Sequence, residues 1–422
     1  MTPGPDARPR SAPTRAVTPP GGTPEVREPA FLGTWNSAVT SYYVLLGATL
    51  LLVAIGLVMV LSSSSVESLA AGKSPYAVFF SQAQYALMGL PVLLVLSRVP
   101  VRLMRAAAWP MLGFAVVFQL LVFTPLGCGA GGNRNWVCVP GFTAQPSEAV
   151  KLALVVWLAA VLSRKLRLLH EWQHALVPAV PVAGVAIGVV LLGHDLGTAM
   201  VMVLLVAGAM FVAGVPLRIF AVAGAAAAAG VAALAIGSEN RMARIMSWLS
   251  ADCDVQNECY QTLHAGYGLA TGGWSGVGLG QSAEKWSYLP AAHNDFIFAI
   301  LGEELGMVGT LLVLALFALL AFAMIRIMRR HPDPFVKIAT AAAFAWIVGQ
   351  ALVNIAVVIG LAPVIGVPLP LVSAGGSALI MTMAALGMLL SFARSEPGAA
   401  EALAARPSVV RRSLAVIGRT RG

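Results

Sequence analysis

Polar and charged side chains gather in one stretch of this sequence, between Gly272 and Gly306. The stretch contains Lys285, His293 and Asp295 and ends with two adjacent glutamates, while the sequence on either side is almost continuously apolar. Polar residues that mass at one place in a membrane protein mark its chemistry or its transport path. We therefore interpret this stretch as an active site held at the outer membrane surface.

A second group of charges lies inside an apolar run. Glu148 and Lys151 are three residues apart, so they share one face of a helix and can form an ion pair. A lone charge in hydrocarbon is costly, and pairing is the expected solution. The spacing is equally compatible with a purely structural bridge and with one that shapes a cavity.

Two aspartates also have a simpler explanation. Aspartate is favoured at helix N-caps, so Asp195 could cap the helix that follows it and Asp295 could cap a helix over residues 296–301. The functional alternative is that Asp195 faces the same outer cavity as the large loop and that Asp295 takes part in the chemistry.

The composition is that of a polytopic membrane protein. Of 422 residues, 58% are hydrophobic and 11% are charged, whereas about a quarter of the residues in soluble domains are charged. An apolar run of roughly 20 residues can span a bilayer. Ten such runs are present, at residues 42–61, 79–96, 107–124, 146–163, 175–192, 198–214, 219–236, 307–327, 336–359 and 377–393.

The basic residues predict the orientation of the chain. Ten spans put both termini on one side, and the loops and tails of that side hold 21 Lys and Arg residues against five in the opposite loops. Basic residues favour cytoplasmic loops, so both termini are expected in the cytoplasm. The net charge of +9 is then a consequence of topology, and a nucleic-acid partner is excluded.

The predicted fold class is an all-α integral membrane protein with ten transmembrane helices. Residues 1–40 are rich in proline and small polar residues and predict a disordered cytoplasmic N-tail. Residues 41–394 form the ten-span domain, in which residues 237–306 make a large outer loop between spans seven and eight. Residues 395–422 form a basic cytoplasmic C-tail.

Two outer segments have unusual compositions. Residues 272–280 are rich in glycine, but no strand precedes their Gly-x-Gly, so a nucleotide site is excluded. We expect these glycines to let the backbone approach a bulky ligand closely. Residues 360–377 contain three prolines, and such irregular backbone near a membrane must be buried in protein or line a wet cavity. The serines at 62–65 are expected to cap the first span and face headgroups.

Six blocks occur in order along the chain: residues 55–65, Arg134-Asn-Trp136, Gln145–Glu148 with Lys151, Asp195–Thr198, 276–306 and 360–377. Together they resemble the SEDS family (shape, elongation, division and sporulation), the RodA/FtsW group of ten-span peptidoglycan glycosyltransferases. The stretch Tyr288–Gly306 and the long N-tail are more similar to the division branch, FtsW, than to the elongation branch, RodA.

The resemblance implies polymerisation of lipid II at the outer face of the cytoplasmic membrane during cell division. Asp295 is carried over from the family as the general base for the 4-hydroxyl of the acceptor sugar. Lys285 and Arg134 are candidates for contact with the departing pyrophosphate. A divalent cation, Mg or Mn, could assist, and no nucleotide is expected. Further substrate-binding candidates are Trp136, His293 and Ser377.

Other interpretations remain open at this point. Glu303 and Glu304 could instead fix the large loop onto span eight. The chain could be an elongation-type polymerase, a flippase for the lipid-linked precursor, or a non-catalytic scaffold for a division transpeptidase. The polar residues concentrate on the outer side, which favours the polymerase over a path through the membrane. The implied partners are a class B penicillin-binding protein and other division proteins, at the septum.

Four cysteines occur, all in predicted outer loops. Cysteines on the oxidising side of a membrane are expected to form disulfides, and four allow three connectivities. Local pairing, Cys128–Cys138 and Cys253–Cys259, needs the fewest assumptions because each pair brackets a short polar turn. The first bridge would hold Arg134 in place. The alternative is four unpaired thiols.

Overall fold

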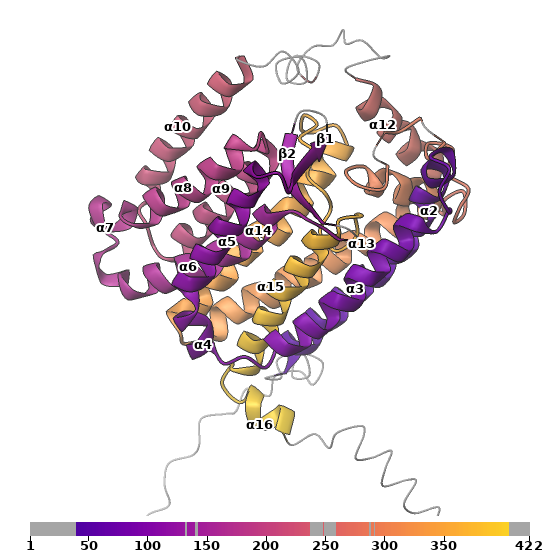
Figure 1. The fold of residues 1–422 in the computed structure, drawn as a ribbon. Coiled ribbons are helices and arrows are strands. Elements are labelled where there is room, and N and C mark those ends of the chain that lie inside the picture. The colour runs from indigo at the N-terminus through magenta and orange to yellow at the C-terminus, as the bar shows by residue number, and fades with distance from the viewer. Residues whose placement is uncertain are drawn as a thin grey trace, which may run out of the picture. The chain divides into compact units, whose positions relative to one another are not determined.

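The protein is described by a computed structural model, shown in Figure 1, over residues 39–130, 133–139, 142–236, 248, 259–286, 288–290 and 292–404. Its longer helices are α2 (Thr40–Ala70), α3 (Ala77–Leu96), α5 (Ala108–Leu120), α6 (Pro146–Arg164), α8 (Ala179–Leu192), α9 (Leu196–Val212), α10 (Leu217–Ile236), α12 (Tyr260–Gly272), α13 (Ile297–Arg330), α14 (Pro334–Val358) and α15 (Gly376–Arg394). Short helices are α4 (Val101–Ala106), η1 (Leu121–Phe123), η2 (Leu166–Leu168), α7 (Trp172–Leu176) and α16 (Ala399–Ala404).

Within the described part of the chain, seven helical stretches are long and apolar enough to cross a membrane. They correspond to α2, α3, α6, α7 with α8, α13, α14 and α15. The other three predicted spans coincide with shorter apolar stretches in α5, α9 and α10. The seven confirm a multi-span helical protein, while the number ten stays a prediction.

Three helices form the interior of the bundle. The apolar windows of α6, α14 and α15 are 83%, 72% and 78% buried, whereas those of α3 and α7–α8 are 28% buried. α14 packs against α6, α9 and α13, and α15 packs against α3 and α2 (Figure 1). Small residues allow the close approach of α9 and α14, because a Cβ added at Gly208 would meet Ala341 and Ala345. Helices α6, α14 and α15 therefore form the core of the bundle.

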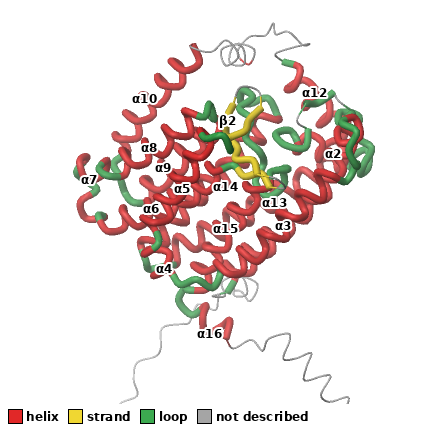
Figure 2. Tube along the Cα trace, in the orientation of Figure 1, coloured by secondary structure: helices red, strands yellow, loops and turns green. Residues whose placement is uncertain are grey.

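A small β-sheet was not predicted by the all-α fold class. Strands β1 (Gly127–Ala130), β2 (Asn133–Val139) and β3 (Phe142–Ala144) form an antiparallel sheet between η1 and α6 in the order β1-β2-β3 (yellow in Figure 2). Strands β1 and β3 have only four and three residues, and the apolar residues of the segment do not alternate with polar ones, so no apolar period of two marks the sheet in the sequence. The sheet, α12 and the ends of α2 and α13 that lie near them define what we call the sheet end of the bundle.

Two predicted segment ends lie inside helices. The first span does not end at its serines: α2 continues to Ala70, and Ser63 and Ser64 are buried, donating to the carbonyls of Met59 and Val60. The last ten residues of the predicted large loop, 297–306, lie in α13, which begins at Ile297 and is broken at Gly306. Residues 297–306 are nearly all buried, and buried backbone needs the hydrogen bonds that a helix supplies.

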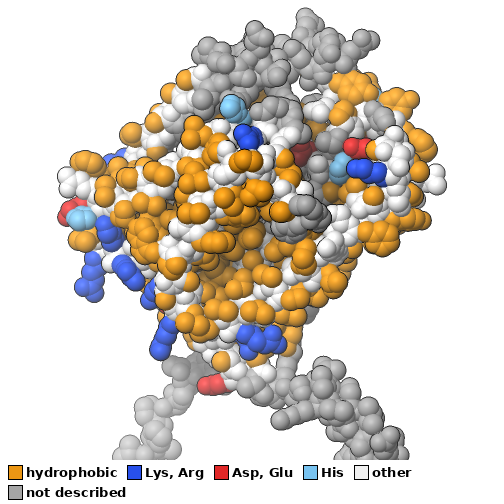
Figure 3. All heavy atoms as spheres, in the orientation of Figure 1, with side chains coloured by type: hydrophobic (Ala, Val, Ile, Leu, Met, Phe, Trp, Pro, Cys, Tyr) orange, Lys and Arg blue, Asp and Glu red, His pale blue; other side chains and the backbone are white. Residues whose placement is uncertain are grey.

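The surface at the end of the bundle opposite the sheet is predominantly positive (Figure 3). The face in Figure 3 is almost entirely hydrophobic in its middle, and Lys and Arg side chains gather toward the end where α4 lies. The predicted N-tail lies, apart from residues 39 and 40, outside the described residues. So does the C-tail beyond residue 404; its earlier part contains α16.

Candidate active site

The turn that carries Asp295 is held at three consecutive backbone carbonyls. Those of residues 293, 294 and 295 accept hydrogen bonds from Ala374 N (2.9 Å), Ser373 Oγ (2.6 Å) and Asn354 Nδ2 (2.8 Å), respectively. The donors come from α14 and from the segment between α14 and α15, residues 359–375, which we call the proline loop. These three hydrogen bonds therefore fix the backbone of the turn relative to α14 and to the proline loop.

The Asp295 side chain is half-buried and lies over the proline loop. A Cβ added at Gly366, whose φ is 75°, would stand 3.6 Å from Asp295 Oδ2. The N-cap of α13 is Phe296, one residue later, and it makes no side-chain capping bond. Asp295 therefore does not occupy the N-cap position that the structural alternative assigned to it.

Buried amides hold the proline loop, and the sequence reasoning missed them. Asn354 Nδ2 also donates to Val367 O (2.8 Å), and Gln350 Nε2 donates to Pro368 O (2.8 Å). On α3, Gln82 donates to Ser373 O and accepts from Gly375 N, both at 3.2 Å. Amide side chains inside otherwise apolar spans were the available signal, since polar groups at that depth require partners.

Glu148 and Lys151 form the predicted ion pair. Lys151 Nζ lies 2.8 Å from Glu148 Oε1, and both side chains are at most 4% exposed. The ammonium also donates to Gln350 Oε1 (3.2 Å) and lies 4.9 Å from the centre of the Trp346 ring. Gln350 and Asn354 are one turn apart on α14, so the ion pair and the Asp295 turn are tied to successive residues of the proline loop.

α13 is broken at Gly306, where φ is 66° and ψ is −162°. A break in a helix leaves amides and carbonyls without partners. The segment 272–280, which we call the glycine loop, supplies them: Val277 N and Gly278 N donate to the carbonyls of residues 303 and 304, and Met307 N and Val308 N donate to those of residues 273 and 274. These glycines were expected to approach a ligand. In the structure, Gly272 and Gly276 instead leave no space for a Cβ because they contact α13.

Lys285 lies in a buried network with Glu304 and Ser62. Its Nζ is 3.1 Å from Glu304 Oε1 and 3.3 Å from Ser62 Oγ, and Ser62 donates to the same carboxylate oxygen at 2.6 Å. The Lys285 side chain is 4% exposed and that of Glu304 is 0% exposed. The network joins the large loop to α2 and α13.

The carboxylate of Glu303 holds the same loop through one side-chain donor and one backbone donor. It accepts hydrogen bonds from Ser282 Oγ and from Ala283 N (2.8 Å). The two glutamates thus fix the loop onto α13, as the alternative interpretation of them proposed. Contact of Lys285 with pyrophosphate stays a prediction.

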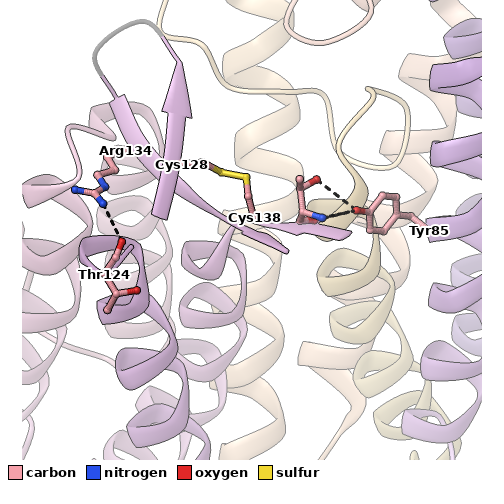
Figure 4. Close-up of a disulfide and its surroundings, with 6 residues drawn as sticks. Tyr85, Thr124, Cys128, Arg134 and Cys138 are labelled. Atoms are coloured by element: carbon pink, nitrogen blue, oxygen red, sulfur yellow. Dashed lines mark hydrogen bonds between the residues drawn. A yellow bond between two sulfur atoms is a disulfide. The ribbon is translucent and has the colours of Figure 1, made fainter. Parts of the chain in front are cut away.

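The predicted Cys128–Cys138 disulfide joins β1 to β2, with the two Cα atoms 6.0 Å apart. Arg134 donates to Thr124 O (2.8 Å), on the side of the hairpin away from Tyr85 (Figure 4). The predicted Cys253–Cys259 bridge lies outside the described residues, since Cys253 is not among them.

The other side of the hairpin meets α3. Tyr85 OH donates to Thr143 O at 2.9 Å (Figure 4). Trp136 and Thr143, with both cysteines and Gly129, line a hollow of 430 Å³. Arg134 and Trp136 are two residues apart in the sequence but have different contacts: Arg134 bonds to Thr124, whereas Trp136 lines the hollow.

Ser377, Gln145 and Asp195 connect three elements. Ser377 Oγ accepts from Gln145 N (2.9 Å), and Gln145 Nε2 donates to Asp195 Oδ2 (3.0 Å). Asp195 Oδ1 accepts from Thr198 N (3.0 Å), so Asp195 is the N-cap of α9, as the structural alternative predicted. His293 Nδ1 lies 2.9 Å from Glu67 Oε2, within ion-pair distance but without hydrogen-bond geometry.

A family model describing cell cycle proteins, of the FtsW, RodA and SpoVE type, matches residues 43–397. The chain belongs to this family. It is 41% identical over 397 residues to the probable peptidoglycan glycosyltransferase FtsW of Mycobacterium tuberculosis, covering 94% of this chain and 75% of the relative. It is 37% identical to the stage V sporulation protein E of Bacillus subtilis, covering 82% of this chain and 95% of the relative.

Solved structures of the family have the same fold. A chain from a peptidoglycan synthase complex matches with a TM-score of 0.70 and 27% identity, covering 83% of this chain and 96% of that chain. The rod shape determining protein RodA of Thermus thermophilus matches with a TM-score of 0.62 and 26% identity, covering 84% and 97%. The family and the fold therefore agree with the resemblance found in the six sequence blocks.

Metal-ligating side chains do not cluster in the part of the chain that the structure describes. Among the described residues, no three His, Cys, Asp or Glu side chains come together in a way that could hold a metal ion. Glu303, Glu304 and Asp195 already accept hydrogen bonds from protein groups. A dedicated cation site needs several such oxygens directed at one point. The divalent cation stays a proposal, and no step below depends on it.

Proposed function

We propose that this chain is a glycosyltransferase that polymerises lipid II into glycan strands at the outer face of the cytoplasmic membrane during cell division. The family supports the substrate class, because its relatives are named peptidoglycan glycosyltransferases. The single observation that carries the assignment of the site is the Asp295 turn, fixed at three consecutive carbonyls with its carboxylate half-buried.

Asp295 acts as the general base in this proposal. Its carboxylate accepts the proton of the acceptor sugar's 4-hydroxyl while that oxygen forms a bond to the anomeric carbon of the donor. The bond from that carbon to the pyrophosphate breaks on the opposite face, so the configuration inverts. A base must be held at hydrogen-bond distance from the proton it takes. The three hydrogen bonds to the carbonyls of residues 293–295 hold the backbone of the base in place.

The departing pyrophosphate requires positive charge near it. Lys285 and Arg134 stay our candidates. Lys285 is buried and donates to Ser62 Oγ and Glu304 Oε1, and the third N–H of its ammonium is the donor that a phosphate oxygen would use. Arg134 is exposed and donates to one backbone carbonyl, so its guanidinium keeps donors available for a ligand. Trp136, His293 and Ser377 stay further candidates for substrate binding.

The rival function is a flippase for the lipid-linked precursor. Such a path would need polar groups through the depth of the bundle. The buried Glu148–Lys151 pair lies in the first two turns of α6, directly after β3, and therefore near the sheet end. The predominance of basic residues at the opposite end supports a cytoplasmic location for that end and an outer location for the site. These observations favour the polymerase.

A class B penicillin-binding protein is the proposed partner. Support comes from the solved peptidoglycan synthase complex whose chain shares this fold. The septum is the proposed location, because the more similar relatives include FtsW proteins.

The decisive experiment combines purified protein, lipid II and the cognate class B penicillin-binding protein in vesicles, with glycan strands resolved by gel electrophoresis. We expect strands with the native chain and a loss on the order of 10²–10⁴-fold with Asp295→Asn, since the amide keeps the size but cannot accept the proton. Asp333→Asn, the same chemical change at the opposite end of the bundle, is the matched control and should retain synthesis. Near-normal synthesis by Asp295→Asn would refute the base assignment.

A further inference from the structure

The glycine loop presents large apolar side chains to the outside of the protein. Trp274 is 74% exposed, Leu279 is 54% exposed and Val277 is 40% exposed. Single exposed apolar residues are ordinary, but a cluster with a tryptophan marks a surface that meets something other than water.

The loop is attached to α13 where the charge-free part of that helix, residues 307–325, begins. Met307 N donates to Gly273 O (2.9 Å) and Val308 N donates to Trp274 O (3.2 Å). Because these are backbone hydrogen bonds, Trp274 lies beside the first residues of α13 after its break at Gly306. The position of the loop along the helix axis is therefore set by the helix itself.

The helix after the break has the surface of a lipid-facing segment. Residues 307–325 contain no charged residue. Met307, Val308, Leu311 and Leu312 are between 44% and 65% exposed. The exposed apolar surface of the glycine loop thus continues directly into the exposed apolar surface of α13.

The charges near the loop are turned away from this surface. Residues 272–283 carry none. The charges that follow are partnered inside the protein: Glu284 lies 2.7 Å from His264 Nδ1, and Lys285 lies 3.1 Å from Glu304. Glu303 is buried and accepts from Ala283 N. A surface that meets lipid needs this arrangement, because unpaired charges there are costly.

We propose that the glycine loop lies in the headgroup layer of the outer leaflet, with Trp274 as its anchor. Tryptophan is enriched at membrane interfaces because its ring is apolar and its indole N–H is polar. The anchored loop sets how deep the Lys285–Glu304 network lies in the membrane. The loop bonds to the backbone of residues 303 and 304 just before the break in α13, and Glu304 belongs to that network. The occupant of this surface is phospholipid rather than a partner protein, and the inference does not depend on the proposed activity.

Depth-dependent quenching tests the proposal with the full-length protein in phosphatidylcholine vesicles. The described residues contain no free cysteine, so Trp274→Cys introduces a thiol for an environment-sensitive fluorophore, and the parent chain measures background labelling. Leu311→Cys, further along α13, is the matched control for the hydrocarbon. Asn133→Cys, on the exposed hairpin, is the matched control for water.

We expect the label at residue 274 to lose fluorescence most strongly with nitroxide on the lipid headgroup, and the label at residue 311, one helical turn further along α13, with nitroxide in the upper part of the acyl chain. The label at residue 133 should respond to aqueous iodide and to neither lipid. Leu279→Cys is the second variant, in case Trp274→Cys does not assemble. A label at 274 quenched by iodide alone, as at residue 133, would overturn the proposal and favour a protein partner. A profile identical to that of residue 311 would overturn the headgroup position.

Discussion

Asn354 donates one hydrogen bond to the carbonyl of Asp295 and another to that of Val367, each at 2.8 Å. One side chain on α14 therefore joins the turn that carries the proposed base to the loop beneath it. Asn354 is 2% exposed, so water cannot replace either bond at low cost.

We predict that Asn354→Leu lowers polymerisation strongly while the protein still inserts and assembles. Two buried carbonyls would lose their donor, at a cost of about 1–3 kcal/mol each. Glycan synthesis at saturating lipid II measures the effect. Thr340→Val is the matched control, because Thr340 is also buried on α14 but bonds only to Val336 O of its own helix. Equal losses in the two variants would show that Asn354 only stabilises α14.

The Glu148–Lys151 pair should behave as a unit. Removing one partner of a buried pair leaves an uncompensated charge, at about 3–5 kcal/mol, whereas removing both is less costly. We predict that Glu148→Gln and Lys151→Met each lower the thermal stability in detergent more than the double variant does. A double-mutant cycle quantifies the coupling. Single effects that simply add would mean that the two charges do not interact in the native protein.

The Cys128–Cys138 bridge should stabilise the hairpin. Closing a loop of this length contributes roughly 2–3 kcal/mol in the chain-entropy model. We predict that Cys128→Ser with Cys138→Ser lowers the unfolding temperature and leaves the α14 contacts with the Asp295 turn in place, because no strand of the sheet takes part in them. Non-reducing peptide mapping of membranes from the native host should recover the bridged peptides. Freely alkylated thiols at both positions would refute the bridge.

His331, which follows α13 at the end opposite the sheet, gives a prediction about pH. Its Nδ1 accepts from Asp333 N (3.1 Å), so the hydrogen-bond network assigns the proton to Nε2, which faces Ser395 Oγ at 3.2 Å. Burial lowers the pKa of His331 below its usual value; Lys337 acts in the same direction and Asp333 opposes them.

The sign of the effect follows from that direction. A histidine whose pKa is lower in the folded state contributes stability at pH values above about 6.5, and this is lost as the pH falls through the lower folded pKa. We predict that the native chain loses more thermal stability between pH 7 and pH 5 than His331→Gln does. Identical pH profiles would mean that His331 is not held in its neutral form.

Much of the architecture was determined by the sequence. Apolar runs and basic loops predict spans and orientation because the bilayer imposes length and charge rules that act on local composition. The Glu148–Lys151 pair was predictable because both residues lie on one helix at a spacing of three. The Cys128–Cys138 bridge was predictable because the residues are close in sequence and expected on the oxidising side.

The tertiary structure alone decided which distant groups meet. Asn354 and Asp295 are 59 positions apart, and Ser62 and Glu304 are 242 apart, so no local period relates them. The glycine run looked like a ligand-binding segment because its composition shows only that backbone comes close to something. In the structure, that something is the break in α13 at Gly306. Amides and carbonyls that lose their partners at a break in a helix must bond to the segment packed against them, which here is the glycine loop.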